Sequence, residues 1–153
     1  MPKITLPQRS ELRQEDTWNA ASVFPTLAVW ETEYQQVQAQ LPMLAQYQGR
    51  LSLGSATLVE ALEAFLQIRN RASKLLVYAS ISSSVDSTDQ ASAALASKSI
   101  SLIGQVRSAG AFLNPEILAL APETLQNWLR EDERVASYAH YLDDLRREQT
   151  HVR

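Results

Sequence analysis

Residues 58–84 read LVEALEAFLQIRNRASKLLVYASISSS, and their apolar members recur at steps of three and four. This spacing places the apolar side chains on one face of an α-helix, where they form a continuous stripe. The stripe consists of Leu58, Leu62, Phe65, Ile68, Ala72, Leu75 and Ala79, followed by Ser82 and Ser83. The sequence therefore predicts a long amphipathic helix.

A second apolar stripe begins shortly after the first. Ser87 and Gln90 have the spacing of a capping box, so we expect one helix to stop near Val85-Asp86-Ser87-Thr88-Asp89 and another to start there. Two amphipathic helices joined by a short polar turn predict an antiparallel hairpin that buries the facing stripes. The second stripe contains Ala91, Leu95, Leu102, Val106 and Leu113, with Ile103 and Ala109 beside it.

The composition indicates an all-α protein. The chain has 153 residues, four glycines and no cysteine, so disulfides and thiolate chemistry are excluded. Its net charge of −3 argues against nucleic-acid and anionic-membrane partners, and no apolar run approaches the length of a membrane span. We expect a loose N-terminal arm over residues 1–16 and a single helical domain over residues 17–153. The predicted fold is an antiparallel helical bundle built on the hairpin, with shorter C-terminal helices.

The segments before the hairpin carry recognisable helix boundaries. Thr26 is placed to cap a helix whose apolar stripe contains Leu27, Trp30, Tyr34, Val37 and Leu41. Pro42 should interrupt that helix, because proline lacks the backbone donor that the helix needs. A short run then ends at Gly49, and Gly54-Ser55 with the capping box Thr57-x-x-Glu60 should begin the first helix of the hairpin.

Three shorter helices are expected after the hairpin. Asn114-Pro115-Glu116 has the order of an N-cap, a first-turn proline and a first-turn acid, and it should open a helix that ends near Leu120. Pro122-Glu123 should open another. The last helix is expected from Glu133 to Glu148, with Val135, Tyr138, Leu142 and Leu145 on one face.

The sequence offers no convincing constellation of catalytic or metal-binding residues. His140 and Asp144 are one helical turn apart, but His151 lies about 16 Å farther along a straight helix, too far to share one ion with His140. The zinc-peptidase motif H-E-x-x-H does not occur. We therefore assign no catalytic, cofactor-binding or metal residue.

Charged and aromatic residues have structural interpretations. Asp143-Asp144 occupies a helix surface and should be solvated, as should the helix face that carries Arg69, Arg71 and Lys74. The tryptophans and most tyrosines lie on apolar stripes, which favours a place in the core.

Four fragments, read in order, resemble the N-terminal region of oligoendopeptidase F, a zinc metallopeptidase family related to thimet oligopeptidase. The first fragment is Trp18 with Val23-Phe24-Pro25 and Trp30-Glu31. The others are Leu76-Val77-Tyr78-Ala79-Ser80-Ile81 with Asp86-Ser87-Thr88, then Phe112-Leu113-Asn114-Pro115-Glu116-Ile117-Leu118, and finally Trp128-Leu129 with Tyr138-Ala139-His140-Tyr141-Leu142. The match extends from Trp18 to His151.

The resemblance implies a parent enzyme that hydrolyses short peptides in the cytoplasm, with zinc held by H-E-x-x-H and a downstream glutamate. In that family the helical N-terminal region forms one wall of the substrate cleft. The zinc site lies outside the part that this chain covers, so zinc is expected in the parent and no cofactor in this chain. The implied partners are the catalytic portion and oligopeptide substrates.

A free-standing helical protein-interaction module is the alternative interpretation. If a catalytic portion docks on this chain, an apolar face near Tyr138, Tyr141 and Leu145 should stay uncovered, because large uncovered apolar patches mark interaction sites. The isolated domain should then self-associate, as a homodimer.

Overall fold

The computed structural model describes residues 12, 13, 15, 17–85 and 89–151, with side chains up to Glu148. Within these residues every regular element is helical and no strand occurs, so the all-α helical bundle is confirmed. The chain divides into two compact units, which are Met1–Gln38 with Asn70–Gly104, and Ala39–Arg69 with Gln105–Arg153. The expected loose arm lies mostly outside the described residues, and the single domain stays a prediction.

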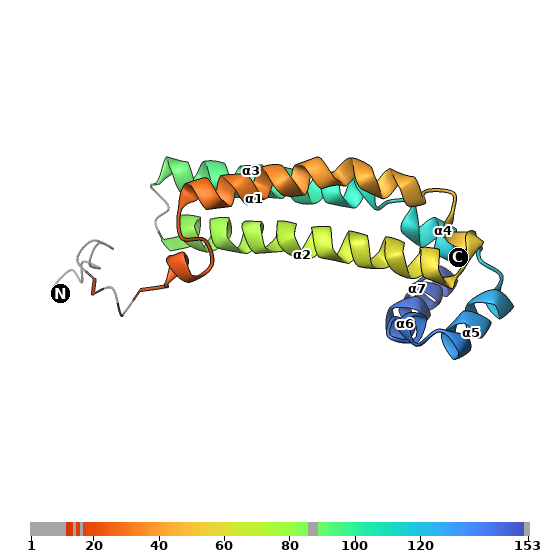
Figure 1. Cartoon of the computed structure of the whole chain (residues 1–153). Coiled ribbons are helices and arrows are strands. Elements are labelled where there is room, and N and C mark those ends of the chain that lie inside the picture. The colour runs from red at the N-terminus through yellow and green to blue at the C-terminus, as the bar shows by residue number, and fades with distance from the viewer. Residues whose placement is uncertain (1–11, 14, 16, 86–88, 152–153) are drawn as a thin grey trace. The chain divides into compact units, whose positions relative to one another are not determined.

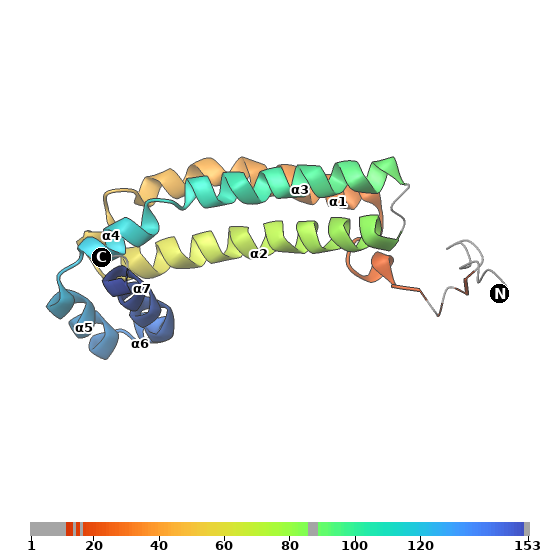
Figure 2. The ribbon, with the colours of Figure 1, turned by 180° about the vertical axis from the view of Figure 1, so that it is seen from behind.

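Three helices lie side by side in the first unit (Figures 1 and 2). α1 and α3 run in the same direction and α2 runs in the opposite direction, as an antiparallel hairpin requires. The unit contains α2 from Asn70 onward and α3 up to Gly104. The bounds are η3 (Ala20–Ser22), α1 (Leu27–Gln40), α2 (Ser55–Val85) and α3 (Gln90–Ala109).

Trp30 is the centre of the first unit. Its side chain is fully buried, and its indole Nε1–H donates to the Leu75 carbonyl of α2 at 3.3 Å. The ring also stacks on Tyr34, with ring centroids 5.5 Å apart. The Lys98 ammonium of α3 lies 5.3 Å from the centroid of the Tyr34 ring. One face of α1 therefore contacts both α2 and α3.

The predicted ends of the first-unit helices are largely correct. The Thr26 hydroxyl accepts a hydrogen bond from the Val29 N–H, as the predicted cap requires. α2 ends at Val85 and α3 begins at Gln90. The expected Ser87 cap lies outside the described residues. Asp89 caps α3 instead, since its carboxylate accepts from the backbone N–H groups of Ala91 and Ser92.

Ser99 is buried in the first unit although the apolar stripe omitted it. Its side chain has no exposed surface, and its hydroxyl donates to the Leu95 carbonyl one turn earlier at 2.9 Å. A hydroxyl satisfied in this way can be buried like a small apolar group.

The second unit combines the first half of α2 with shorter helices and one apolar core. α4 contacts both η5 and α7, and α5 contacts α6. The core includes Leu51, Leu58, Leu62, Ile117, Leu125, Val135 and Leu142, all nearly inaccessible to solvent. The bounds are η4 (Leu41–Tyr47), η5 (Leu51–Leu53), α4 (Leu113–Ala119), α5 (Pro122–Glu131), α6 (Glu133–Ala136) and α7 (Ala139–His151).

The turn before α2 is tied to α4. α1 gives way to η4 at Pro42, as predicted, and the chain then turns at Gly49 with a φ of 74°. The Gly49 N–H donates to the Glu116 carboxylate at 2.6 Å. A residue with a side chain rarely adopts this left-handed conformation, so glycine suits the position.

The start of α2 at Ser55 agrees with the predicted Gly54-Ser55 boundary, although Thr57 lies within the helix rather than at its cap. The Ser55 hydroxyl donates to Asp132 at 2.9 Å, and the Leu58 N–H bonds to the Gly54 carbonyl. Two other predictions in this unit are wrong. Asn114 is not an N-cap, since α4 already begins at Leu113.

The single last helix is also wrong, because Ser137 separates α6 from α7. Its hydroxyl donates to the Arg134 carbonyl at 2.6 Å, and its N–H bonds back to Glu133. Serine at a helix end often competes in this way for backbone groups that would otherwise continue the helix.

Gly110 allows an aromatic ring to approach the end of α3. Gly110 is buried, and a Cβ placed on it would lie 2.2 Å from Phe65 Cε2 of α2. That distance is far below any carbon–carbon contact, so the Phe65 ring occupies the space that any other residue at position 110 would need.

Replacing Glu33 should cost stability in a pH-dependent way. Arg71 donates two hydrogen bonds to the Glu33 carboxylate, at 2.6 and 2.9 Å. These bonds lower the pKa of Glu33, although burial acts in the opposite direction. The stabilisation is therefore present above the pKa of the unfolded state and is lost as the pH falls through the lower pKa of the folded state.

We expect Glu33→Gln to lower the free energy of unfolding by about 1 kcal/mol at about pH 7 and by much less at about pH 3. Urea denaturation at both pH values measures this. Glu31→Gln is the matched control, because its partner Lys98 and Glu31 itself are more exposed. An equal loss for Glu33→Gln at both pH values would contradict the role of the ion pair.

Gly110→Ala should destabilise the protein by about 1 to 3 kcal/mol, because the new methyl group displaces the Phe65 ring. Gly104→Ala is the control, since Gly104 lies within α3, before Gly110, and a Cβ there meets nothing within 4 Å. It should stabilise the protein by up to about 1 kcal/mol through helix propensity. Thermal denaturation of both variants measures the difference, and equal effects would show that the contact with Phe65 is unimportant.

Candidate functional site

A hollow of about 430 Å³ opens on the second unit, beside the core. Its lining residues come from α2, from the end of α3 and the start of α4, and from the residues around the start of α7. A pocket of this size can hold a small ligand. The lining residues are Leu62, Phe65, Leu66, Arg69, Arg107, Gly110, Ala111, Leu113, Asn114, Tyr138 and Tyr141.

Two arginines line this hollow and form no ion pair with a described carboxylate. Arg69 of α2 and Arg107 of α3 are exposed, and neither forms an ion pair with any residue that the structure describes. Two other arginines of the same unit, Arg134 and Arg147, form ion pairs with Asp132 and Asp143, whereas Arg50, Arg130 and Arg146 form none with the described residues. The hollow thus combines an apolar lining with two available positive charges.

The two tyrosines give the hollow a polar edge. The Tyr141 hydroxyl donates to the Asn114 side-chain oxygen at 2.7 Å, which joins α7 to α4. Burial raises the pKa of Tyr141, the Arg69 charge partly offsets this, and Glu148 adds to it. Burial also raises the pKa of Tyr138, with a smaller contribution from Glu63. Both tyrosines are therefore neutral hydrogen-bonding groups at neutral pH.

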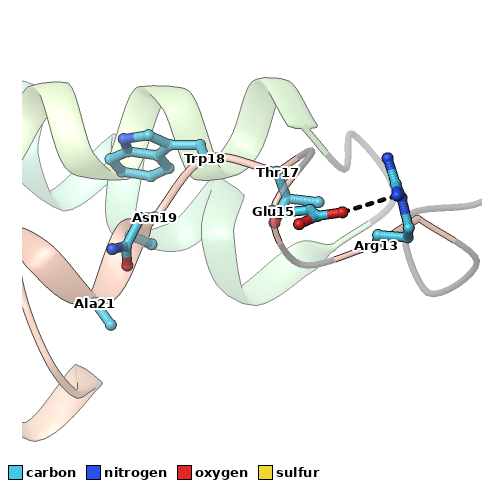
Figure 3. A pocket seen from close by; sticks show the side chains of 7 residues that line it. Arg13, Glu15, Thr17, Trp18, Asn19 and Ala21 are labelled. Atoms are coloured by element: carbon cyan, nitrogen blue, oxygen red, sulfur yellow. Dashed lines mark ion pairs between the residues drawn. The ribbon is translucent and has the colours of Figure 1, made fainter.

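A second, larger hollow lies at the N-terminal segment of the first unit (Figure 3). Its charged residues are Arg13 and Glu15, which form an exposed ion pair at 2.8 Å. Trp18 faces α2, where its ring lies 5.5 Å from the Tyr78 ring. Because its opposite charges pair with each other and its aromatic ring packs on the helix, this hollow offers less to a ligand than the hollow of the second unit.

The residues considered for metal binding do not form a site. His140 Nε2 lies 3.3 Å from Asp144 Oδ2, and the His140 side chain is 91% exposed. The His151 side chain is outside the described part of the chain. Among the described residues, no group of three or more histidine, cysteine, aspartate or glutamate side chains could hold a metal ion.

The apolar face expected at the C-terminal end is only partly correct. Tyr141 is 39% exposed and Tyr138 is half-buried, and both line the hollow of the second unit. Leu145 is 7% exposed and belongs to the core instead. Uncovered surface in this region is therefore aromatic and polar rather than aliphatic, and self-association stays a prediction.

Of the three basic residues expected on one wet helix face, Arg69 and Lys74 are exposed, whereas Arg71 is partly buried. Arg71 pairs with Glu33, and the Lys74 ammonium lies 5.2 Å from the Phe24 ring centroid. Arg69 instead lines the hollow with Arg107. Sequence spacing could have indicated this pair, because Arg69 precedes Ser87 by 18 residues and Arg107 follows it by 20. Residues at similar distances from the turn of an antiparallel hairpin lie opposite each other.

Within the described residues, no helix combines the length and apolar character needed to cross a membrane.

Comparisons with known proteins give a consistent result. A family model described as oligopeptidase F matches residues 116–153. Oligopeptidase PepF of Bacillus subtilis is 35% identical over 147 residues, which cover 96% of this chain and 22% of PepF. The chain thus spans less than a quarter of that relative.

Two crystal structures share the fold. Oligoendopeptidase F from Enterococcus faecium superposes with a TM-score of 0.75 and 24% identity, over 80% of this chain and 24% of its own. A protein from Chlamydophila abortus superposes with a TM-score of 0.82 and 21% identity, over 94% of this chain and 24% of its own. These matches agree with the resemblance found in the sequence, and the chain corresponds to the N-terminal region of the oligoendopeptidase F family.

Proposed function

We propose that this chain is the N-terminal helical domain of a zinc-dependent oligoendopeptidase that hydrolyses short peptides. The observation that carries the proposal is the 35% identity to Bacillus subtilis oligopeptidase PepF across 96% of this chain. Identity at this level over 147 residues supports a shared role as well as a shared fold. A peptidase domain therefore accounts for the chain better than a free-standing interaction module.

In this proposal the chain forms part of the wall of the substrate cleft and supplies no catalytic residue. The catalytic portion, with its zinc ion, is the partner, and the complete enzyme acts in the cytoplasm. The described donor groups support this division, since His140 and Asp144 are an exposed pair on one helix. Zinc in peptidases activates a water molecule for attack on the peptide bond, and that role belongs to the catalytic portion.

A chimera tests the proposal. The region of Bacillus subtilis PepF that matches this chain is replaced by the chain itself, and the hydrolysis of a fluorogenic oligopeptide is measured with and without a chelator. We expect chelator-sensitive hydrolysis by the chimera and none by PepF that lacks the region, because a wall of the cleft is then absent.

The matched control is a second chimera that carries the corresponding region of a Lactococcus lactis oligoendopeptidase F, whose plasmid form is 26% identical to this chain. Activity in that control would show that the region can be exchanged between relatives. If the control is active while the chimera with this chain binds zinc but cleaves no peptide, the proposed function is wrong.

A further inference from the structure

We propose that the hollow of the second unit binds a peptide by its free C-terminal carboxylate, with the last apolar side chain against Phe65 and Leu66. The choice of a peptide rests on the proposed function, whereas the choice of a carboxylate rests on the side chains of the hollow. None of the described residues that line the hollow is assigned to a metal site or to a catalytic role. The proposed role of the hollow is therefore to bind and orient a ligand.

Charge supports a carboxylate as the ligand. Arg69 and Arg107 line the same hollow and pair with no carboxylate of the described chain, although the chain carries 17 acidic residues. A guanidinium group presents parallel N–H donors that match the two oxygens of a carboxylate. An incoming carboxylate therefore needs to displace no existing ion pair.

The lining supports an apolar side chain next to that carboxylate. Leu62, Phe65 and Leu66 supply aliphatic and aromatic surface on one side, and the Tyr138 ring supplies more on another. Because Gly110 has no side chain, the Phe65 ring can lie close to the Gly110 backbone. The Asn114 oxygen is occupied by the Tyr141 hydroxyl, which leaves the Asn114 NH₂ group as a donor for a peptide carbonyl.

The same features disfavour other ligands. A polyanion such as RNA is held mainly by many basic groups, whereas this chain has a net charge of −3. A purely apolar helix of a second copy would bury the two guanidinium groups without partners, which is costly. A short peptide that ends in an apolar residue satisfies both the charges and the apolar lining.

Two-dimensional NMR of the isotope-labelled chain tests the proposal, with N-acetyl-phenylalanyl-leucine as the probe and its C-terminal amide as the matched ligand. We expect saturable shifts at the backbone amides of Gly110, Ala111, Asn114 and Tyr141. The amide should bind about tenfold more weakly, because it cannot form charge-assisted hydrogen bonds with the arginines.

Arg69→Gln and Arg107→Gln should each weaken binding of the free acid several-fold and leave binding of the amide unchanged. Arg50→Gln is the control, because Arg50 is an exposed arginine of the same unit outside the hollow. Circular dichroism of each variant verifies that the helices are retained, which is expected because all three side chains are exposed.

Equal binding of acid and amide, or an equal effect of Arg50→Gln, would overturn the proposal. Shifts confined to other surfaces would do the same, as would concentration-dependent shifts at the hollow without peptide, which would identify a second copy as the occupant. These outcomes are separate from the chimera experiment. A chimera that binds zinc but is inactive beside an active control, with carboxylate-dependent binding here, would refute the proposed function alone, and an active chimera without such binding would refute only the site.

Discussion

The short connection between α2 and α3 is the constraint on which the rest of the fold depends. α2 ends at Val85 and α3 begins at Gln90, so the chain has room only to reverse its direction. The two helices of the first unit must then run antiparallel, and their apolar stripes face a common interior. Trp30 of α1 fills that interior, and its indole N–H is satisfied by a carbonyl of α2. The large indole ring of Trp30 can be buried at the centre of the first unit because its polar N–H group makes this hydrogen bond.

Apolar periodicity and helix-boundary residues predicted most of the architecture. The hairpin, the cap at Thr26 and the break at Pro42 follow from local chemistry, because each depends on residues within one or two turns. The errors arose at helix ends that apolar spacing cannot locate. α4 begins at Leu113, one residue before the predicted cap Asn114. α6 ends where the Ser137 hydroxyl donates to the Arg134 carbonyl.

The hollow was harder to predict than the fold. Arg69 looked like one of several solvated bases, and nothing local distinguishes it from Arg71, which is held by a carboxylate of α1. Only the register of the hairpin brings Arg69 to the same hollow as Arg107. Gly110 lies so close to the Phe65 ring that a Cβ would clash with it, and no pattern in a single sequence predicts this approach. Of the aromatic residues expected in the core, Trp30 and Tyr34 are buried, Trp18, Trp128 and Tyr138 are partly buried, and Tyr141 is exposed at the hollow.

The bond from the Gly49 backbone to Glu116 also bears on how the chain is made. Its partners are 67 residues apart, so the turn at Gly49 leaves the ribosome well before the carboxylate that holds it. Until that carboxylate emerges, the left-handed turn has no long-range support, and the residues around η4 and η5 remain a late-maturing part of the nascent chain. The N-terminal and C-terminal parts of the second unit therefore leave the ribosome at different times. The second unit can form its complete core only after the C-terminal helices have been synthesised.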